Sequence, residues 1–172
     1  MTLPAVASAI ARMTDACFVL VGPETQVREA LPAGLRTHPQ IRFKNATEVV
    51  AMDDAIEVAL RRKKDSSMRI AVELVKAGEA DAAVSAGNTG ALMAMAKLAL
   101  RMLPGIDRPA IASFFPTERG ESCMLDLGAN VECDAENLVQ FAILGDMFAR
   151  AVLGIPKPTI GLLNVGSEEM KG

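Results

Sequence analysis

The stretch "VSAGNTGALM", residues 84–93, joins two kinds of apolar sequence across a short polar turn. An apolar run with strand character leads into the turn, and an apolar run with helical spacing leaves it. Gly87 and Gly90 bracket two small polar residues. Because glycine has no Cβ, it lets another group approach the backbone closely. A buried strand, a glycine turn and a helix in this order predict an α/β unit.

The same alternation continues along the chain and predicts a mostly parallel sheet covered by helices on both faces. No internal repeat or low-complexity linker interrupts it, so we expect a single domain over residues 1–172. Short apolar runs between turn residues predict strands at 16–22, 41–45, 81–87, 109–116, 122–128 and 159–166. Apolar periodicity near 3.6 predicts helices at 24–31, 53–64, 66–78, 89–103 and 134–154.

Three of these helices carry more detailed signals. Asp53 or Asp54 is a possible N-cap for the helix at 53–64, and a serine is expected to cap the helix at 66–78. The helix at 89–103 has two charged residues and is expected to be buried around most of its circumference. In the helix at 134–154, spacings of three and four predict an inner face made of Leu138, Phe141, Gly145, Phe148 and Val152.

Composition excludes several function classes. The 172 residues carry a net charge of −3, and six Phe are the only aromatic residues, so nothing favours nucleic-acid binding. A single histidine, His38, argues against a histidine triad or a multi-histidine metal site. The three cysteines are widely spaced and predict free thiols in a reducing cytoplasm, with a reactive thiol at Cys133 as the alternative. No stretch is apolar for long enough to span a membrane.

Three loops share one plan, in which an apolar strand leads into a turn that holds glycine and asparagine. They lie at 83–90, 124–132 and 162–172. Ligands of open α/β sheets bind beyond the carboxyl ends of parallel strands, where these turns would gather. Glycine backbone N–H groups and helix N-termini favour an anion or a carbonyl there. The alternative is that Gly87 and Gly90 serve only a tight turn and close packing of a helix on a strand.

Basic residues supply a second candidate feature. "RRKKDSS", residues 61–67, places four cations just before a helix start. They are either a solvated helix end or a patch that recruits anions beside Ser66 and Ser67. Lys171 follows "GSEEM" in the last loop, beyond a predicted strand. The turn at 85–90 matches neither the dinucleotide fingerprint nor the P-loop, so neither nucleotide class is predicted.

Five stretches together resemble bacterial phosphate acyltransferases, the acyl carrier protein–phosphate transacylases of phospholipid synthesis. The resemblance runs along nearly the whole chain and is strongest from Arg61 to Gly172. The stretches are "RRKKDSSM", "DAAVSAGNTGALMA", "GIDRPAIA", "LDLGANVECDAENLVQFAILG" and "IGLLNVGSEEMKG". It implies a three-layer α/β/α, Rossmann-like fold related to phosphotransacetylases and isocitrate-type dehydrogenases. It also implies transfer of a long acyl chain from acyl carrier protein to inorganic phosphate, with no cofactor and no metal.

The resemblance extends to partners, location and site residues. It implies a homodimer in the cytoplasm with peripheral membrane association. Lys171 is the expected catalytic residue, since it matches a lysine in the family's glutamate-rich loop. Phosphate or the acyl carbonyl is expected to be held by Ser85, Gly87, Asn88, Thr89 and Gly90, with Lys64 and Ser67 nearby and with Asn130, Asn164 and Gly166 on a facing wall.

Family chains are about twice as long as this one, and they begin with a strand and an Asp-x-Met-Gly-Gly-Asp segment that is absent here. We therefore expect this chain to be part of a longer protein and to hold only part of the active site. Three alternatives stay open. They are a short-chain phosphotransacetylase that uses coenzyme A, a non-catalytic module that binds anions or acyl carrier protein, and a nicotinamide-dependent dehydrogenase suggested by fold analogy alone.

Overall fold

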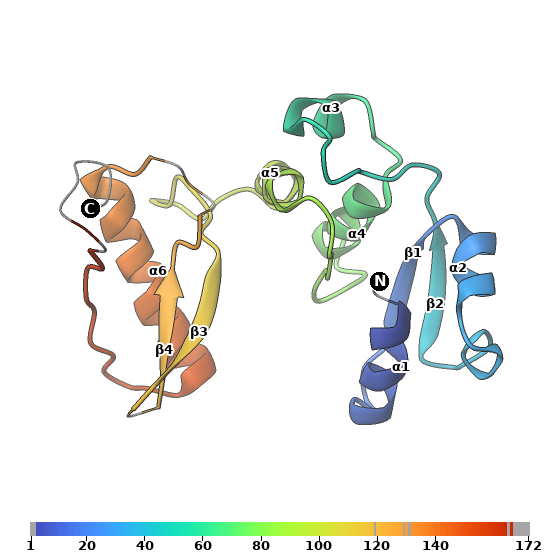
Figure 1. The fold of residues 1–172 in the computed structure, drawn as a ribbon, viewed down its shortest axis with the longest axis horizontal. Coiled ribbons are helices and arrows are strands. Elements are labelled where there is room, and N and C mark those ends of the chain that lie inside the picture. The colour runs from blue at the N-terminus through green and yellow to red at the C-terminus, as the bar shows by residue number, and fades with distance from the viewer. Residues whose placement is uncertain (1–2, 119, 129, 131, 165, 167–172) are drawn as a thin grey trace. The chain divides into compact units, whose positions relative to one another are not determined.

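A computed structural model describes residues 3–118, 120–128, 130, 132–164 and 166. Its chain divides into two compact units, Met1–Arg101 and Met102–Gly172 (Figure 1). Both units contain helices and strands, which confirms a mixed α and β composition. A single domain over residues 1–172 stays a prediction, because each unit is described by itself.

The N-terminal unit begins with a small parallel sheet and the helices around it. Strands β1 (Phe18–Gly22) and β2 (Ile41–Asn45) pair in parallel with Phe18 opposite Ile41, which confirms both predicted strands. Helices α1 (Leu3–Arg12) and α2 (Glu24–Ala30) and the short 3-10 helix η1 (Ala33–Leu35) complete this part, and α2 confirms the helix predicted at 24–31. Its core contains Val6, Ile10 and Ile41, with Phe18, Leu20, Leu35 and Phe43 packed against them.

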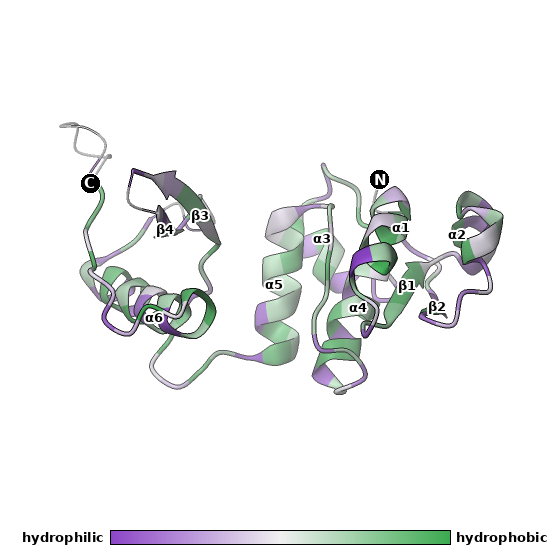
Figure 2. Ribbon diagram, turned by 90° about the horizontal axis from the view of Figure 1, so that it is seen from below, coloured by the Kyte–Doolittle hydropathy of each residue, from purple (hydrophilic) through white to green (hydrophobic). Residues whose placement is uncertain are grey.

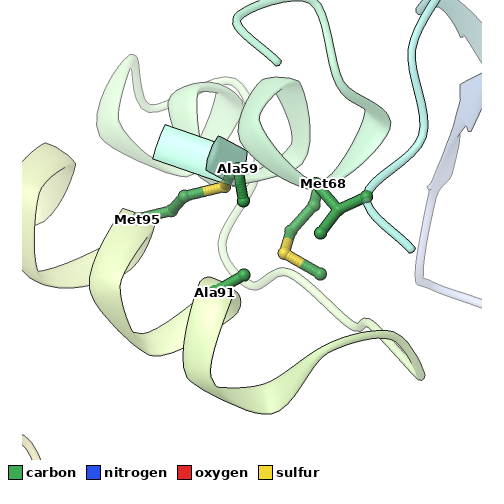
Figure 3. Close-up of a cluster of buried hydrophobic side chains, with 5 residues drawn as sticks. Ala59, Met68, Ala91 and Met95 are labelled. Atoms are coloured by element: carbon green, nitrogen blue, oxygen red, sulfur yellow. The ribbon is translucent and has the colours of Figure 1, made fainter. Parts of the chain in front are cut away.

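Three further helices form the second core of this unit. They are α3 (Ile56–Arg61), α4 (Ser67–Lys76) and α5 (Thr89–Leu100), each within a predicted helix. Figure 3 shows Ala59, Met68, Ala91 and Met95 from these helices meeting in one cluster. Val50, from the loop before α3, also belongs to it. Alanines at two of these positions let the helix backbones come close, and the flexible thioethers fill the space between them.

Three local predictions for this unit are wrong. Helix α3 starts after Ala55, because the Asp54 carboxylate accepts hydrogen bonds from Ala51 and Lys63 instead of capping the helix. Residues 81–87 form no strand, and Val84 is 87% exposed, because no strand pairs with this segment in the described part of the chain. Helix α5 is apolar on most sides (Figure 2), yet Leu98 is 68% exposed and only Ala91 and Met95 are buried.

The C-terminal unit is a β-hairpin packed on one long helix. Strands β3 (Ala112–Thr117) and β4 (Gly120–Leu125) confirm the two predicted strands but pair in antiparallel fashion. Helix α6 (Ala135–Leu153) lies against β4, and the rings of Phe114 and Phe148 stack with centroids 5.6 Å apart. A direct hairpin joins strands that follow closely in sequence, whereas a parallel pair needs a long crossover.

Helix α6 is delimited by strong end signals. The Asp134 side chain accepts a hydrogen bond from the Asn137 backbone N–H within a capping box, and Gly154 ends the helix in the left-handed conformation. The predicted inner face is only partly right. Phe141 is buried, but Val152 is 56% exposed. Two polar residues, Asn137 and Gln140, are buried instead, because Gln140 binds both the backbone and the carboxylate of Asp107.

The last predicted strand, at 159–166, is not formed within its described residues. Ile160, Leu162 and Leu163 are all more than 60% exposed. An apolar sequence pattern becomes a strand only where a neighbour pairs with its backbone groups. The described residues therefore hold one parallel and one antiparallel pair of strands instead of a mostly parallel sheet. No helix among them is long and apolar enough to cross a membrane.

Truncation of Met68 tests the second core. Met68→Ala removes a side chain that is 6% exposed, and we expect the free energy of unfolding to fall by about 2–5 kcal/mol. Met52→Ala, at a side chain that is 70% exposed, is the matched control and should change it by less than about 0.5 kcal/mol. Urea unfolding followed by far-ultraviolet circular dichroism measures both, and equal effects would contradict this core.

Candidate functional site

The 84–90 turn lies beside a pocket in the N-terminal unit. The pocket has a volume of about 230 Å³ and brings together three residues predicted from the sequence, Ser67, Ser85 and Gly87. The Ser85 hydroxyl accepts a hydrogen bond from the Gly87 backbone N–H at 3.2 Å, which closes the turn. The full lining is Val49, Val50, Ser67, Met68, Ser85, Ala86 and Gly87.

The two glycines of the turn make room for side chains of the protein itself. A Cβ on Gly87 would lie 3.1 Å from the methyl carbon of Met68, and one on Gly90 would lie 2.9 Å from Cδ1 of Ile56. Neither glycine has the positive φ that would demand glycine for backbone reasons. Close packing therefore accounts for both positions, as the alternative interpretation of the sequence proposed.

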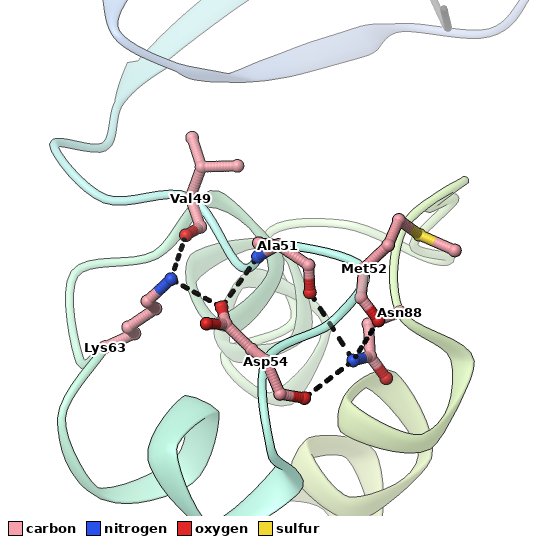
Figure 4. A network of polar contacts seen from close by, with 6 residues as sticks. All are labelled: Val49, Ala51, Met52, Asp54, Lys63 and Asn88. Carbon is pink, nitrogen blue, oxygen red and sulfur yellow. Dashed lines mark hydrogen bonds and ion pairs between the residues drawn. The ribbon is translucent and has the colours of Figure 1, made fainter.

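The side chain of Asn88 holds the turn in place. Its Oδ1 accepts a hydrogen bond from the Ala91 backbone N–H at 3.0 Å, which caps helix α5. Its Nδ2 donates to the carbonyl oxygens of Met52 at 3.1 Å and Asp54 at 3.0 Å (Figure 4). Both polar ends of the carboxamide are thus bound to backbone groups. Asn88 fixes the geometry of the turn and does not point free donors at a ligand.

A second group of polar contacts supports the same loop. Lys63 Nζ donates to the Val49 carbonyl oxygen at 2.8 Å and forms an ion pair with Asp54 (Figure 4). The Asp54 carboxylate also accepts from the Ala51 backbone N–H at 2.7 Å. The hydrogen bond from Lys63, and next that from Ala51, lower the pKa of Asp54 below its ordinary value. No sequence motif joins Asp54 to Lys63, so this pair was not predicted.

The other basic residues before α4 are more open. Arg61 pairs with Glu57 at 3.0 Å, but both side chains are more than 70% exposed. Such pairs contribute little to stability. Lys64 is exposed, and Thr89 is exposed at the start of α5. These positions fit either interpretation, a solvated helix end or an anion-recruiting patch.

Ser66 occupies the N-cap position of α4, yet its hydroxyl makes no capping hydrogen bond. The side chain is fully buried, and its oxygen has no hydrogen-bond partner within the described residues. The next residue, Ser67, donates its backbone N–H to the Glu48 carbonyl oxygen at 3.0 Å and faces the pocket. The prediction of a serine at the N-cap of α4 is confirmed. The capping hydrogen bond expected from its side chain is not formed.

The remaining predicted residues belong to the C-terminal unit. The Asn130 side chain donates to the Asp126 carboxylate at 2.9 Å and to the Pro109 carbonyl oxygen at 3.0 Å. Asn164 Oδ1 accepts from the Gly166 backbone N–H at 2.9 Å. Lys171 lies outside the described residues. A wall built from these groups and facing the 84–90 turn stays a prediction.

The cysteines, the histidine and the possible metal ligands are the other candidates in the described part of the chain, and a reactive thiol at Cys133 stays an alternative. Cys17 and Cys133 are free and exposed, and burial raises the pKa of the partly buried Cys123. His38 Nδ1 accepts from the Gln40 backbone N–H at 3.3 Å. Among the described residues, no group of three or more His, Cys, Asp or Glu side chains is arranged to hold a metal ion.

The whole sequence, residues 1–172, matches the family model described as "Fatty acid synthesis protein". The chain belongs to this family. Relatives named "Phosphate acyltransferase" share much of the sequence. The protein of Janthinobacterium sp. (strain Marseille) is 54% identical and that of Aeromonas salmonicida (strain A449) is 56% identical, each over 99% of this chain. The protein of Rhodospirillum centenum is 57% identical over 94% of it.

This chain matches only part of each of these relatives. The match covers 48% of the Janthinobacterium relative, 51% of the Aeromonas relative and 45% of the Rhodospirillum relative. The chain therefore spans about half the length of the relatives named phosphate acyltransferase that it matches.

The Asp54–Lys63 pair makes a pH prediction. The folded-state pKa of Asp54 lies below its ordinary value of 3.8, so the ionised carboxylate stabilises the loop above that pH. This contribution should fall away as the pH drops through 3.8 and through the folded-state pKa.

Asp54→Asn should remove the acid-side loss of hydrogen-exchange protection at the backbone N–H of Ala51. Asp53→Asn is the matched control, because its exposed side chain makes no hydrogen bond within the described part of the chain. An unchanged acid profile in Asp54→Asn would show that the pair is not formed in solution.

Proposed function

We propose that this chain takes part in transferring a long fatty acyl group from acyl carrier protein to inorganic phosphate, giving acyl phosphate for phospholipid synthesis. One observation carries this proposal. The chain matches phosphate acyltransferases at 54–57% identity along 94–99% of its length. Acyl carrier protein as donor fits a family of fatty acid synthesis proteins.

The reaction places defined demands on the site. A phosphate oxygen attacks the thioester carbonyl, a carbon–oxygen bond forms, the carbon–sulfur bond breaks, and the thiolate of the carrier leaves and takes a proton from solvent. Thiolates leave readily, so a histidine acid is not required. Positioning of the phosphate and donors aimed at the developing oxyanion supply most of the rate. Direct transfer needs no acyl-enzyme, so Cys133 has no role in it.

The pocket beside the 84–90 turn supplies groups suited to these demands. Ser67, Ser85 and Gly87 all line it, and the two serines carry hydroxyls that can hydrogen-bond to an oxyanion or a carbonyl. Asn88 and Gly90 act by holding the turn. Thr89 and Lys64 are exposed and lie close in sequence to Gly87 and Ser67. We place the phosphate or the acyl carbonyl in this pocket.

The proposal extends to parts of the protein beyond this pocket. Asn130, Asn164, Gly166 and Lys171 complete the site, with the Lys171 ammonium as the catalytic charge. The full-length fold is a three-layer α/β/α, Rossmann-like arrangement with a parallel sheet. The protein works in the cytoplasm as a homodimer associated with the membrane surface.

The decisive assay measures phosphate-dependent loss of acyl groups from acyl carrier protein, with hydroxylamine to trap acyl phosphate. We expect turnover by this chain or by a protein that joins it to the other half of the Aeromonas relative. Acyl–coenzyme A as the preferred donor would favour a short-chain phosphotransacetylase. Binding of acyl carrier protein without turnover in either protein would favour a non-catalytic module.

Lys171→Ala tests the catalytic charge in whichever of these proteins turns over. Loss of the ammonium removes a charge that fixes phosphate or stabilises the tetrahedral anion, so turnover should fall at least about tenfold. Lys157→Ala, at an exposed lysine in the same unit, is the matched control and should leave turnover unchanged. Near-normal turnover of Lys171→Ala would remove this residue from the mechanism.

The cations before α4 make a separate prediction about the donor. If Arg61 and Arg62 attract the acidic acyl carrier protein, its Michaelis constant should rise steeply with salt. Charge reversal, Arg61→Glu with Arg62→Glu, should raise that constant at low salt and flatten its salt dependence. Arg12→Glu with Lys44→Glu makes the same charge change at exposed positions elsewhere in the N-terminal unit. Identical salt dependence in both double variants would contradict docking at α3.

A further inference from the structure

The half-buried side chain of Asn130 is bound by the protein at its nitrogen end only. Nδ2 donates to the Asp126 carboxylate at 2.9 Å and to the Pro109 carbonyl oxygen at 3.0 Å, so both of its hydrogens are used. These two acceptors also fix the orientation of the carboxamide, because turning it over would place oxygen against oxygen. Within the described residues, Oδ1 accepts no hydrogen bond. The group that Asn130 offers to a ligand is therefore an acceptor.

Segment 107–111 and the loop at 126–132 are also joined by the side chain of Arg108. Its Nη1 donates to the Glu132 carbonyl oxygen at 2.8 Å. Gln140 of α6 anchors the segment, since it binds both the backbone and the carboxylate at position 107. The place of the Asn130 carboxamide is thus set before any ligand binds. Arg108 is exposed, and a guanidinium has several N–H donors, of which this bond uses one.

The Asp126 carboxylate determines which kind of group can face Asn130 Oδ1. Besides Nδ2, it accepts from the Asn130 backbone N–H at 2.8 Å. A donor bonded to a carboxylate is polarised, and the polarisation passes along the amide, so Oδ1 becomes a stronger acceptor. The same negative charge repels a bare anionic oxygen. Oδ1 therefore favours the hydrogen of a donor over an oxyanion, while Arg108, next to Pro109 in the chain, supplies positive charge for the rest of an anion.

We infer that Asn130, positioned by Asp126, binds the P–OH group of inorganic phosphate and selects phosphate over fully deprotonated anions. This inference rests on the proposed function for phosphate as the ligand, and it adds the protonation state that the site recognises. Of the two reacting groups, the thioester carbonyl has no hydrogen to donate, whereas phosphate at neutral pH keeps a hydroxyl. Phosphate held in this way keeps its unprotonated oxygens, the better nucleophiles, for the thioester. Sulfate has the same shape but no proton, so it places an oxygen against Oδ1.

Anion titrations test this inference without relying on turnover, in the full 172-residue chain and in the protein that joins it to the other half of the Aeromonas relative. Asparagine carboxamides are labelled for NMR, and phosphate or sulfate is added at neutral pH and constant ionic strength. We expect phosphate to shift the Asn130 signal, and sulfate to bind at least about tenfold more weakly, because it leaves this acceptor unpaired. Arsenate, which is protonated like phosphate, should behave like phosphate. Exposed Asn45, which accepts from the Glu24 backbone N–H at 3.1 Å, is the reporter that should not move.

Three variants separate recognition from folding, with the ratio of phosphate to sulfate affinity, measured by calorimetry, as the readout. Asp126→Ala releases Nδ2, so the carboxamide can turn and donate, and the two anions should then bind with similar affinity. Asp126→Asn keeps an oxygen acceptor for Nδ2 and should retain the preference for phosphate. Asn130→Ala removes the acceptor and should lose the preference, which keeps the inference testable if Asp126→Ala does not fold by circular dichroism. A merely structural role would weaken both anions alike.

Each outcome decides the inference. Equal shifts at Asn130 and Asn45 mean an adventitious ion only and overturn it. No shift at Asn130 with phosphate in either protein also overturns it. Equal affinity for phosphate and sulfate at Asn130, together with turnover in the acyl phosphate assay, sinks the inference and leaves the proposed function standing. Selective binding of phosphate at Asn130 without turnover in that assay supports the inference and refutes the proposed acyl transfer.

Discussion

The carboxamide of Asn88 is the contact on which the candidate site depends. It bonds at once to the first turn of α5 and to the loop at 51–54, two segments more than 30 residues apart in the sequence. Without it, the start of α5 would lose its cap and the loop would lose its anchor. The buried cluster around Met68 lies directly beneath, so the polar anchor and the apolar core position the same turn. The pocket beside Ser85 is open because both sides of the turn are fixed from within the protein.

The Asp54–Lys63 pair also fixes the backbone of this loop. Lys63 reaches back to the Val49 carbonyl, and Asp54 receives both this lysine and the Ala51 N–H. A cation that the sequence offers as an anion-binding group is therefore neutralised by a carboxylate of the protein. Lys64 and Arg62, by contrast, are exposed. The loop gains a fixed backbone and leaves its apolar side chains in contact with solvent.

The glycines of the turn show how one sequence feature supports two physical explanations. Glycine at 87 and 90 permits close approach, and in the structure the approaching groups are Met68 and Ile56. Packing of this kind places the helix α5 N-terminus near α3 and α4, and the pocket results from that packing. Replacing either glycine with a larger residue would therefore disturb the packing of Met68 or Ile56 first.

The sequence by itself determined the elements that depend on short-range signals. The apolar run at 18–22, the capping residues Asp134 and Gly154 and the periodicity of α4 act within a few residues, so β1, α4 and α6 form where expected. Family membership also follows from the sequence, since motifs in a fixed order need no coordinates. Only the tertiary structure decided which apolar segments become strands, because a strand requires a partner for its backbone N–H and C=O groups. It also decided that the polar groups of Asn88 and Lys63 bind the protein's own backbone and Asp54. Those partners are distant in the chain, and they meet only when the core around Met68 has formed.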